Sequence, residues 1–337
     1  MSGATCVRCA LAEAGHDRCT VVAIRVEERP LLENYGHGLV IAGDVGGTKT
    51  AVGLYDVGAH ELVAVARFPT PTEDEPSAFV ERFAQAAEAL IEGAGRQRLE
   101  LRAAGLAVPG LVDARGRVVR AGKLRSWRDV ALSELVGARL GVATSVEQDA
   151  NAAALAERWR GVAAAMSDFV FLALGTGVGA GVVVDGKLLR GSHDAAGEVG
   201  DLRELGSAPG PAGVKLGNRI GGKAIAADAS LLVRADLAAA QAIAGASGDP
   251  RLEELADEVA ELVSIAVFAI ITVVDPEAIV FGGGTAAAGD ALLARVRTAL
   301  EGHVCAIPHL VVSALGEDAQ LFGAVYGGLS LLERSPG

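Results

Sequence analysis

Aromatic residues and long apolar runs are scarce in this chain. Only 4% of its 337 residues are Phe, Trp or Tyr, although 51% are hydrophobic, so Ala, Val, Leu and Ile must build the core. No apolar run reaches the roughly 20 residues that span a bilayer. The N-terminus lacks an apolar block between a basic start and a small-residue cleavage site, which argues against secretion. The sequence therefore predicts a cytoplasmic protein with no membrane partner.

Positive charge is also in short supply. The chain has 30 Lys and Arg against 42 Asp and Glu, a formal net charge of −12, and no basic patch stands out. Because nucleic-acid surfaces depend on clustered cations, no nucleic-acid partner is expected. At roughly 100–200 residues per domain, the length predicts two domains in one chain.

Cysteine is rare and unevenly placed. Cys6, Cys9 and Cys19 combine with His16 in a C-x2-C-x6-H-x2-C pattern, a spacing that could ligate zinc. The segment has no second motif and little apolar periodicity, so residues 1–38 are interpreted in preference as a poorly ordered N-terminal extension. The fourth cysteine, Cys305, is expected to be a small core residue.

Regular structure is expected from about residue 39 onward. Strands are predicted at LVIAGD, AVGLYDV and ELVAVARFP, and a helix at PSAFVERFAQAAEALIEGAG. The segment FVFLALGTGVGAGVVVDGKLLRG repeats the opening layout of strand, Gly-rich turn and strand. A long helical stretch is predicted from about 222 to 272. An internal repeat of this kind indicates two related α/β halves.

Three Gly-rich turns recur through this duplicated pattern: Gly46-Gly47-Thr48, Gly175-Thr176-Gly177 and Gly282-Gly283-Gly284. Glycine lets backbone N–H groups surround an anion without a Cβ in the way. Any one turn could be a simple hairpin, but three in one α/β pattern favour phosphate binding. A Rossmann fingerprint would need a helix after the first turns, and no Walker A sequence is present. Asp44, at the end of the first strand, could hold hydrated Mg²⁺ beside phosphates.

The motifs combine in an order that resembles a known family. DVGGTKT, LAVPGLVD, EQDANAAALAE, LGTGVGAGVVVDGKLLRG, AAGEVGD and IVFGGGTAAAGD follow one another between about residues 39 and 332. The chain is similar in these motifs to the ROK family of repressors, open reading frames and sugar kinases. The resemblance implies an α/β protein with the actin-like ATPase fold, two ribonuclease-H-like lobes and an interlobe cleft. It places one lobe at 39–145, joined by a C-terminal helix at about 317–333, and the other at 146–316.

The resemblance also implies an activity and a set of site residues. The activity is glucokinase-like phosphorylation of a hexose hydroxyl by ATP with Mg²⁺, carried out by a homodimer. Asp149 would be the general base, which a sugar hydroxyl needs because it is a poor nucleophile. Asp44 would hold Mg²⁺ through water. The implied ATP and phosphate contacts are Asp44, Gly46, Gly47, Thr48, Lys49, Gly175, Thr176, Gly177, Gly282, Gly283 and Gly284. The implied sugar contacts are Gly110, Lys123, Gln148, Asp149, Glu198 and Asp201.

The sugar side departs from the pattern that the resemblance implies. Gln148 stands where the family usually has Asn, Lys123 where it has a sugar-contacting Asn, and Asp201 where it has His. The family's zinc loop ends in Cys-Leu-Glu, whereas GSAPGPAGVKLGNRIGG contains no Cys and Gly217 aligns with the Glu. No structural zinc is expected, because its ligands are gone.

Three functions therefore stay open. A glucokinase-like hexose kinase is favoured by Asp149 and the three nucleotide motifs. A non-catalytic sugar sensor of the ROK type would explain the altered sugar side, although the 38 residues before the core are too few for a winged helix. A kinase for another sugar, aminosugar or sugar acid is the third; Lys123 would favour an anionic ligand if it faces the cleft, and is otherwise a solvated surface lysine.

The position of Asp149 fits two interpretations at once. It stands at the head of the alanine-rich run DANAAALAERWRG, which is predicted to be a helix. Asp is a preferred N-cap residue, and the helix dipole stabilises its negative charge. The same placement would keep the carboxylate ionised and ready to accept a proton.

Overall fold

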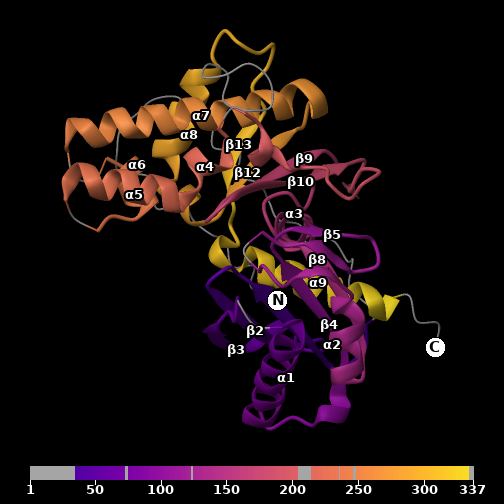
Figure 1. Ribbon diagram of the computed structural model, residues 1–337. Helices are drawn as coiled ribbons and strands as arrows, with labels where there is room; N and C mark the ends of the chain where they lie inside the picture. Colours follow the sequence, from indigo (N-terminus) through magenta and orange to yellow (C-terminus); the bar gives the residue numbers. More distant parts are fainter. Residues whose placement is uncertain are drawn as a thin grey trace, which may run out of the picture.

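The computed structural model describes residues 35–72, 75–122, 124–203, 214–234, 236–245 and 248–333. The predictions for Cys6, Cys9, His16 and Cys19 and for Lys123 fall outside these residues. Within them the chain is a mixed α/β protein with two five-stranded sheets and a small three-stranded sheet. Figure 1 shows the first sheet with α1 and α2 at one end of the molecule and the second sheet with α4–α8 at the other.

The first sheet combines a hairpin with two parallel strands. In spatial order its strands are β3 (Glu61–Pro69), β2 (Lys49–Asp56), β1 (Leu39–Val45), β4 (Leu101–Val108) and β8 (Ala143–Gln148). The β1–β2 hairpin encloses the first Gly-rich turn, and β1, β4 and β8 are parallel. Parallel strands end at one edge of a sheet, so Asp44, Val108 and Gln148 lie along that edge.

The second sheet has the same layout. In spatial order its strands are β11 (Lys187–Leu189), β10 (Val178–Val184), β9 (Phe169–Leu174), β12 (Ala278–Gly282) and β13 (His309–Val312). The β9–β10 hairpin encloses the second Gly-rich turn, and β12 runs parallel to β9. The third Gly-rich turn therefore starts at the same sheet edge as the second.

A small sheet follows the Pro109-Gly110 turn. It consists of β5 (Leu111–Val112), β6 (Val118–Arg120) and β7 (Arg128–Val130). Gly110 has a φ of +105°, and a Cβ there would lie 2.3 Å from the carbonyl oxygen of Arg120. Glycine is therefore required by the backbone at this turn, whether or not a ligand binds there.

Helices cover both faces of the first sheet. The helices α1 (Pro76–Gly93) and α2 (Leu132–Leu140) share one hydrophobic core with β1, β2 and β4. The helix α9 (Ala319–Glu333) packs on the opposite face, in a core with Val40, Ala103 and Ala152. The helix α3 (Asp149–Arg160) contacts α9 on one side and β9 and β10 on the other, and thus lies between the two sheets (Figure 1).

Small residues let α9 approach its neighbours closely. A Cβ on Gly323 would lie 2.0 Å from the carbonyl oxygen of Ala152, and one on Gly105 would lie 2.0 Å from that of Ala324. These contacts explain the small residues on one face of α9 and the alanines of α3, because larger side chains would force the elements apart.

Three observations correct or refine the sequence predictions. The single helical stretch expected over about 222–272 is instead three helices, α5 (Gly222–Val233), α6 (Ala239–Ile243) and α7 (Pro250–Val274). Asp249, whose side chain accepts a hydrogen bond from the Arg251 N–H, starts α7. Cys305 is exposed, so the core prediction is wrong; it lies between α8 (Asp290–Leu300) and β13, where no helix or strand turns it inward.

The first sheet ends later in the chain than predicted, and the remaining helices are short. The strand β8 continues to Gln148, which pairs with Val108, so the first sheet extends beyond the predicted boundary at 145/146. The remaining short helices are α4 (Gly217–Ile220) and the 3₁₀ turns η1 (Arg98–Glu100), η2 (Val199–Asp201), η3 (Gly284–Ala288) and η4 (Gly316–Asp318). In the described part of the chain, no helix combines the length and apolarity needed to cross a bilayer.

Candidate active site

Asp44 and Asp149 meet at the edge of the first sheet. Asp44 is the next-to-last residue of β1, and Asp149 directly follows β8. Burial, and after it the negative charge of Asp149, raises the pKa of the half-buried Asp44 carboxyl to about 7, while Lys49 and Arg67 act in the opposite direction. The two predicted carboxylates are therefore close enough to repel each other.

The capping of α3 differs from the simplest prediction by one residue. The N-cap is Gln148, whose side-chain oxygen accepts a hydrogen bond from the Asn151 N–H at 3.1 Å. Asp149 is the first helical residue, and its Oδ1 accepts a hydrogen bond from the Ala150 N–H at 2.8 Å. Gln148 thus performs the capping, while Asp149 stays at the positive end of the helix dipole.

Three of the predicted sugar-side residues, Gln148, Glu198 and Asp201, cluster next to this helix start. Gln148 Nε2 donates a hydrogen bond to Glu198 Oε1 over 3.4 Å. Burial raises the pKa of Glu198, Asp201 raises it further, and Arg120 and Lys215 lower it. Gln148, Glu198 and Asp201 are thus brought together with Asp149, as the resemblance implies.

Asp201 forms an ion pair with Lys215, a residue that the sequence predictions did not single out. Backbone contacts reinforce the pair, because the Leu216 N–H donates to the Leu202 carbonyl and Arg203 forms a β-bridge with Lys215. Residues 204–213 lie outside the described chain. Among the residues that are described, no group of three or more His, Cys, Asp or Glu is placed to hold a metal. The absence of a structural zinc stays a prediction.

The first Gly-rich turn is a tight hairpin turn with exposed donors at its tip. The Gly46 N–H donates to the Lys49 carbonyl at 2.9 Å, and a Cβ on Gly46 would lie 2.7 Å from that oxygen. Thr48 and Lys49 are exposed, and the Lys49 ammonium lies 3.7 Å from the Glu317 carboxylate. The backbone of this turn is therefore a simple hairpin turn. The exposed Thr48 hydroxyl and Lys49 ammonium can still contact an anion.

The second and third Gly-rich turns lie side by side. The Gly175 N–H donates to the Gly177 carbonyl at 3.0 Å. Gly283 has a φ of +87°, and a Cβ there would lie 2.7 Å from the carbonyl oxygen of Leu174. Two turns separated by about a hundred residues of sequence therefore form one surface, which includes Thr176 of the second turn and Gly284 of the third.

The start of α5 packs against the second turn, a feature that the sequence predictions missed. The Gly222 N–H donates to the Gly175 carbonyl at 2.7 Å, and a Cβ on Gly221 would lie 2.8 Å from the Thr176 carbonyl oxygen. Helix N-termini attract anions through their unpaired N–H groups and dipole. The signal in the sequence is the pair Gly221-Gly222 directly before a helical segment.

Asp44 suits the magnesium ion that the resemblance implies. Its carboxylate is half-buried, and repulsion from Asp149 favours a neighbouring cation. Carboxylate oxygens are hard ligands of the kind that Mg²⁺ prefers, and a single carboxylate with several retained waters is a common arrangement. The chemistry of Asp44 thus fits the implied ion, and its role as the magnesium ligand stays a prediction.

Two α/β sheets of identical layout, each with a Gly-rich hairpin turn, define the actin-like ATPase class of sugar-kinase folds. The model of the ROK family matches residues 40–328. The chain therefore belongs to the ROK family, which confirms the predicted family and fold class.

The relatives include kinases along nearly the whole chain. A glucokinase from Halalkalibacterium halodurans is 28% identical over 306 residues, covering 83% of this chain and 92% of the relative. The crystal structure of a ROK hexokinase from Thermus thermophilus is similar, with a TM-score of 0.70 and 31% identity, over 88% of this chain and 100% of that one. A ROK glucokinase from Streptomyces griseus in complex with glucose and AMPPNP gives a TM-score of 0.71 at 25% identity, over 87% of this chain and 100% of that one.

Proposed function

We propose that this protein is a glucokinase-like, ATP-dependent sugar kinase that transfers the terminal phosphoryl group of ATP to a hexose hydroxyl. The observation that carries the proposal is the meeting of Asp149 with Asp44 at one sheet edge, beside the Gln148–Glu198 contact. Similarity to a glucokinase and a hexokinase along most of the chain supports this reaction. The relative in complex with glucose and AMPPNP supports a sugar and ATP as the two ligands.

Asp149 acts as the general base. It sits in the first turn of α3 and accepts a backbone hydrogen bond from Ala150, where the helix dipole stabilises negative charge. An ionised carboxylate accepts the proton of the attacking hydroxyl as the oxygen–phosphorus bond forms. The backbone contact fixes Oδ1 and so limits the directions from which the hydroxyl approaches.

The sugar is held by Gly110, Lys123, Gln148, Glu198 and Asp201. The Gln148–Glu198 hydrogen bond of 3.4 Å is long and therefore weak, so a sugar hydroxyl can replace it at little cost. Gln148 also caps α3 through its oxygen, so a sugar contact to Gln148 uses only its Nε2 group. The candidate substrates are hexoses, aminosugars and sugar acids, and a panel of these compounds distinguishes among them.

The three Gly-rich turns and Asp44 bind Mg-ATP. Exposed Thr48 and Lys49 reach the phosphates from the first turn, and Gly175, Thr176 and Gly177 do so from the second. Gly282, Gly283 and Gly284 bind the adenosine. Asp44 would hold Mg²⁺ through water, and the ion supplies charge neutralisation at the transferring phosphoryl group.

The remaining predictions join the proposal on the same grounds. The chain forms a first lobe, predicted at 39–145 with 317–333 and extended to Gln148 by β8, and a second lobe that runs to 316, with a cleft between the two. It works in the cytoplasm as a homodimer, as the family resemblance implies. Light scattering combined with size-exclusion chromatography tests the dimer, and a monomer mass at micromolar concentration would contradict it.

The test is sugar-dependent ADP release measured over a panel of hexoses, N-acetylated aminosugars and sugar acids with Mg-ATP. The wild type is expected to release ADP with at least one of them. Asp149→Asn is expected to lower kcat by about 10²–10⁴-fold, the usual contribution of a general base. The matched control is Asp249→Asn, which changes the N-cap aspartate of α7, a residue with no assigned role in the site, and should retain wild-type rates.

Two outcomes would overturn the assignment. Stabilisation by a sugar without ADP release from any member of the panel would indicate the sensor function instead. Wild-type kcat in Asp149→Asn would remove Asp149 as the base while leaving the kinase function standing.

A further inference from the structure

The residue directly before Gln148 carries a buried charge that none of the predicted roles uses. Glu147 is the next-to-last residue of β8 and only 8% exposed. Its Oε1 accepts hydrogen bonds from the Gln148 N–H at 3.0 Å, from Asn151 Nδ2 at 3.1 Å and from Arg190 Nη1 at 2.9 Å. Its Oε2 pairs with Arg190 Nη2. One carboxylate thus ties together the end of β8, the first turn of α3 and a distant arginine.

Arg190 begins the segment that leads from the second sheet to Glu198. It follows β11 directly. The Ala196 N–H donates to the Arg190 carbonyl at 3.0 Å, and the Ala180 N–H of β10 donates to the Gly197 carbonyl at 2.8 Å. The segment is therefore a closed turn anchored to the second sheet, and a displacement of Arg190 moves Glu198 with it.

Two consecutive residues of the first sheet thus contact the two ends of the segment 190–198. Glu147 holds Arg190, and Gln148 holds Glu198. Asp149 is the next residue along the chain. The first contact is bidentate and charge-assisted, which makes it directional and stiff, whereas the second is a single long hydrogen bond. The Glu147–Arg190 pair therefore determines where Glu198 lies relative to Asp149.

We propose that Glu147 and Arg190 are positioning residues that align the sugar ligand Glu198 with the base Asp149. The inference rests on the proposed kinase function, because it assigns Glu198 and Asp149 to one substrate. Transfer requires that the hydroxyl bound on one side meet the base on the other, and an error of about 1 Å in such alignment can cost about 100-fold in rate. The pair acts through Asp149 and Glu198 and does not contact the reacting atoms.

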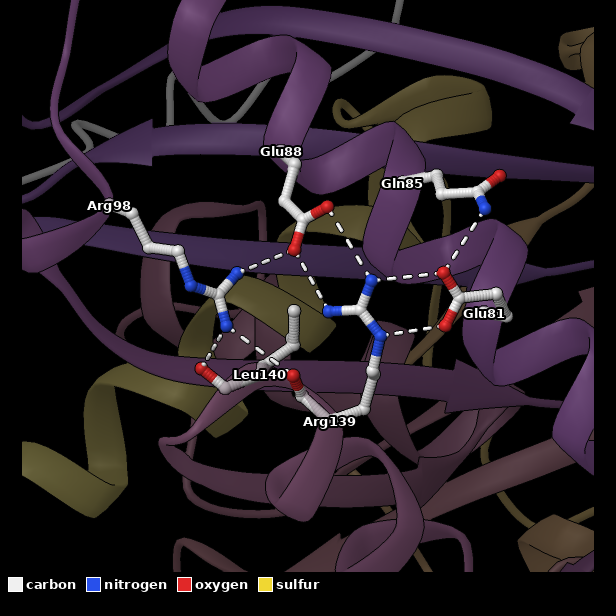
Figure 2. Close-up of polar contacts among 6 residues, drawn as sticks. All are labelled: Glu81, Gln85, Glu88, Arg98, Arg139 and Leu140. Carbon is white, nitrogen blue, oxygen red and sulfur yellow. Dashed lines mark hydrogen bonds and ion pairs between the residues drawn. The ribbon is translucent and has the colours of Figure 1, made fainter.

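An exposed arginine network on the first lobe provides the matched control. Arg139 of α2 donates to both oxygens of Glu81 and to Glu88 Oε1 of α1, as Figure 2 shows. It is also a bidentate arginine–carboxylate contact between two elements. It involves none of the residues assigned to the sugar or the nucleotide, so Arg139→Gln and Arg139→Lys control for the loss of such a contact in itself.

The experiment compares kcat, sugar KM and the thermal unfolding midpoint in full-length variants. Arg190→Lys keeps the charge opposite Glu147 and loses the planar two-point contact. We expect an unfolding midpoint close to that of the wild type, a kcat lower by roughly tenfold and a smaller change in KM. Arg190→Gln combined with Glu147→Gln removes both charges, so no unpaired charge stays buried. Its midpoint should recover relative to Arg190→Gln alone, while kcat stays about 100-fold low.

The outcomes separate positioning from mere stabilisation. Recovery of kcat together with the midpoint in the double variant would overturn the proposal, as would wild-type kcat in Arg190→Lys. A drop in kcat of equal size in the Arg139 variants would also overturn it. A wild type without sugar-dependent ADP release contradicts the proposed kinase function itself, and the positioning role then falls with it.

Discussion

Two arginine–carboxylate networks in this protein use the same hydrogen bonds in different surroundings. The Arg139 network lies on the outside of α1 and α2, where the side chains of Glu81 and Glu88 are 48% and 40% exposed (Figure 2). The Arg190 network lies at the junction of the two sheets, where the Glu147 side chain is only 10% exposed. Water reaches the carboxylates of the first network and has little access to the Glu147 carboxylate, although the Arg190 side chain itself is 34% exposed.

The difference teaches that burial, more than the number of hydrogen bonds, decides what each network does. Exposed ion pairs contribute little because water and salt compete with them. A buried carboxylate that loses its partner is costly, since nothing else compensates its charge. The outer network can therefore change with little consequence, whereas the inner one constrains the geometry around Asp149.

The largest expected stability effect comes from breaking the buried network at one partner. Arg190→Gln leaves the Glu147 carboxylate with only Gln148 and Asn151 as donors. We expect the free energy of unfolding to fall by up to about 3 kcal/mol, the lower end of the usual cost of breaking a buried ion pair, because two donors to Glu147 remain. Urea unfolding of this variant and of Arg139→Gln checks the comparison; equal changes in both variants would remove the distinction.

The next prediction concerns the pH dependence of stability at Asp44, a carboxyl group that is partly buried without an arginine partner in the described part of the chain. Asp44 is half-buried and lacks a hydrogen-bonded arginine in the described contacts, and its pKa is raised to about 7. A raised carboxyl pKa means that its contribution to stability is full below the unfolded pKa of about 3.8 and is lost as pH rises toward 7. Without Mg²⁺, Asp44→Asn should therefore gain stability over the wild type as pH increases from 4 to 8, by about 1.4 kcal/mol per pKa unit at most.

Thermal unfolding in the presence of a chelator measures this difference. The variant and the wild type should unfold at similar temperatures at the acidic end and diverge toward the alkaline end. A difference that stays constant from acid to alkaline pH would show that Asp44 does not titrate in this range.

Glu81 should behave in the opposite sense and more weakly. Hydrogen bonds from Arg139 are the main cause that lowers the pKa of Glu81. A lowered carboxyl pKa gives a contribution that is present above the unfolded pKa and is lost as pH falls through the folded one. Glu81→Gln should therefore lower the unfolding midpoint slightly at neutral pH and match the wild type in acid. A larger deficit in acid than at neutral pH would be the contrary result.

Salt should give the smallest and most selective effect. Raising NaCl from about 0.1 M to about 1 M shortens the Debye length from about 10 Å to about 3 Å and screens exposed pairs more than buried ones. The stability difference between wild type and Arg139→Gln should shrink with salt, while that for Arg190→Gln should persist. Thermal unfolding of the wild type and the two variants at both NaCl concentrations, without chemical denaturant, measures these differences.

Much of this architecture follows from local patterns in the sequence. The apolar runs and Gly-rich turns predict the β1–β2 and β9–β10 hairpins, because both are made of contiguous residues. The order of the motifs predicts the family. The alanine-rich run predicts α3, although the N-cap is Gln148 and not Asp149.

Contacts between distant residues account for what the sequence predictions missed. Glu147 and Arg190 lie 43 residues apart, and neither has an unusual local pattern that would reveal the pair. The approach of Gly222 to Gly175 depends on how the start of α5 meets the turn after β9, about 50 residues earlier in the chain. The exposure of Cys305 depends on an irregular segment whose direction no periodicity sets.

The most direct test of the central claim is identification of the product after incubation with Mg-ATP and the sugar that gives the fastest ADP release. Mass spectrometry of the wild-type reaction should show one phosphoryl group on the hexose, in amounts equal to the ADP formed, and Asp149→Asn should reduce both together. ADP formed without a phosphorylated sugar would contradict the account, because it would show that water, and not a sugar hydroxyl held by Glu198, accepts the phosphoryl group.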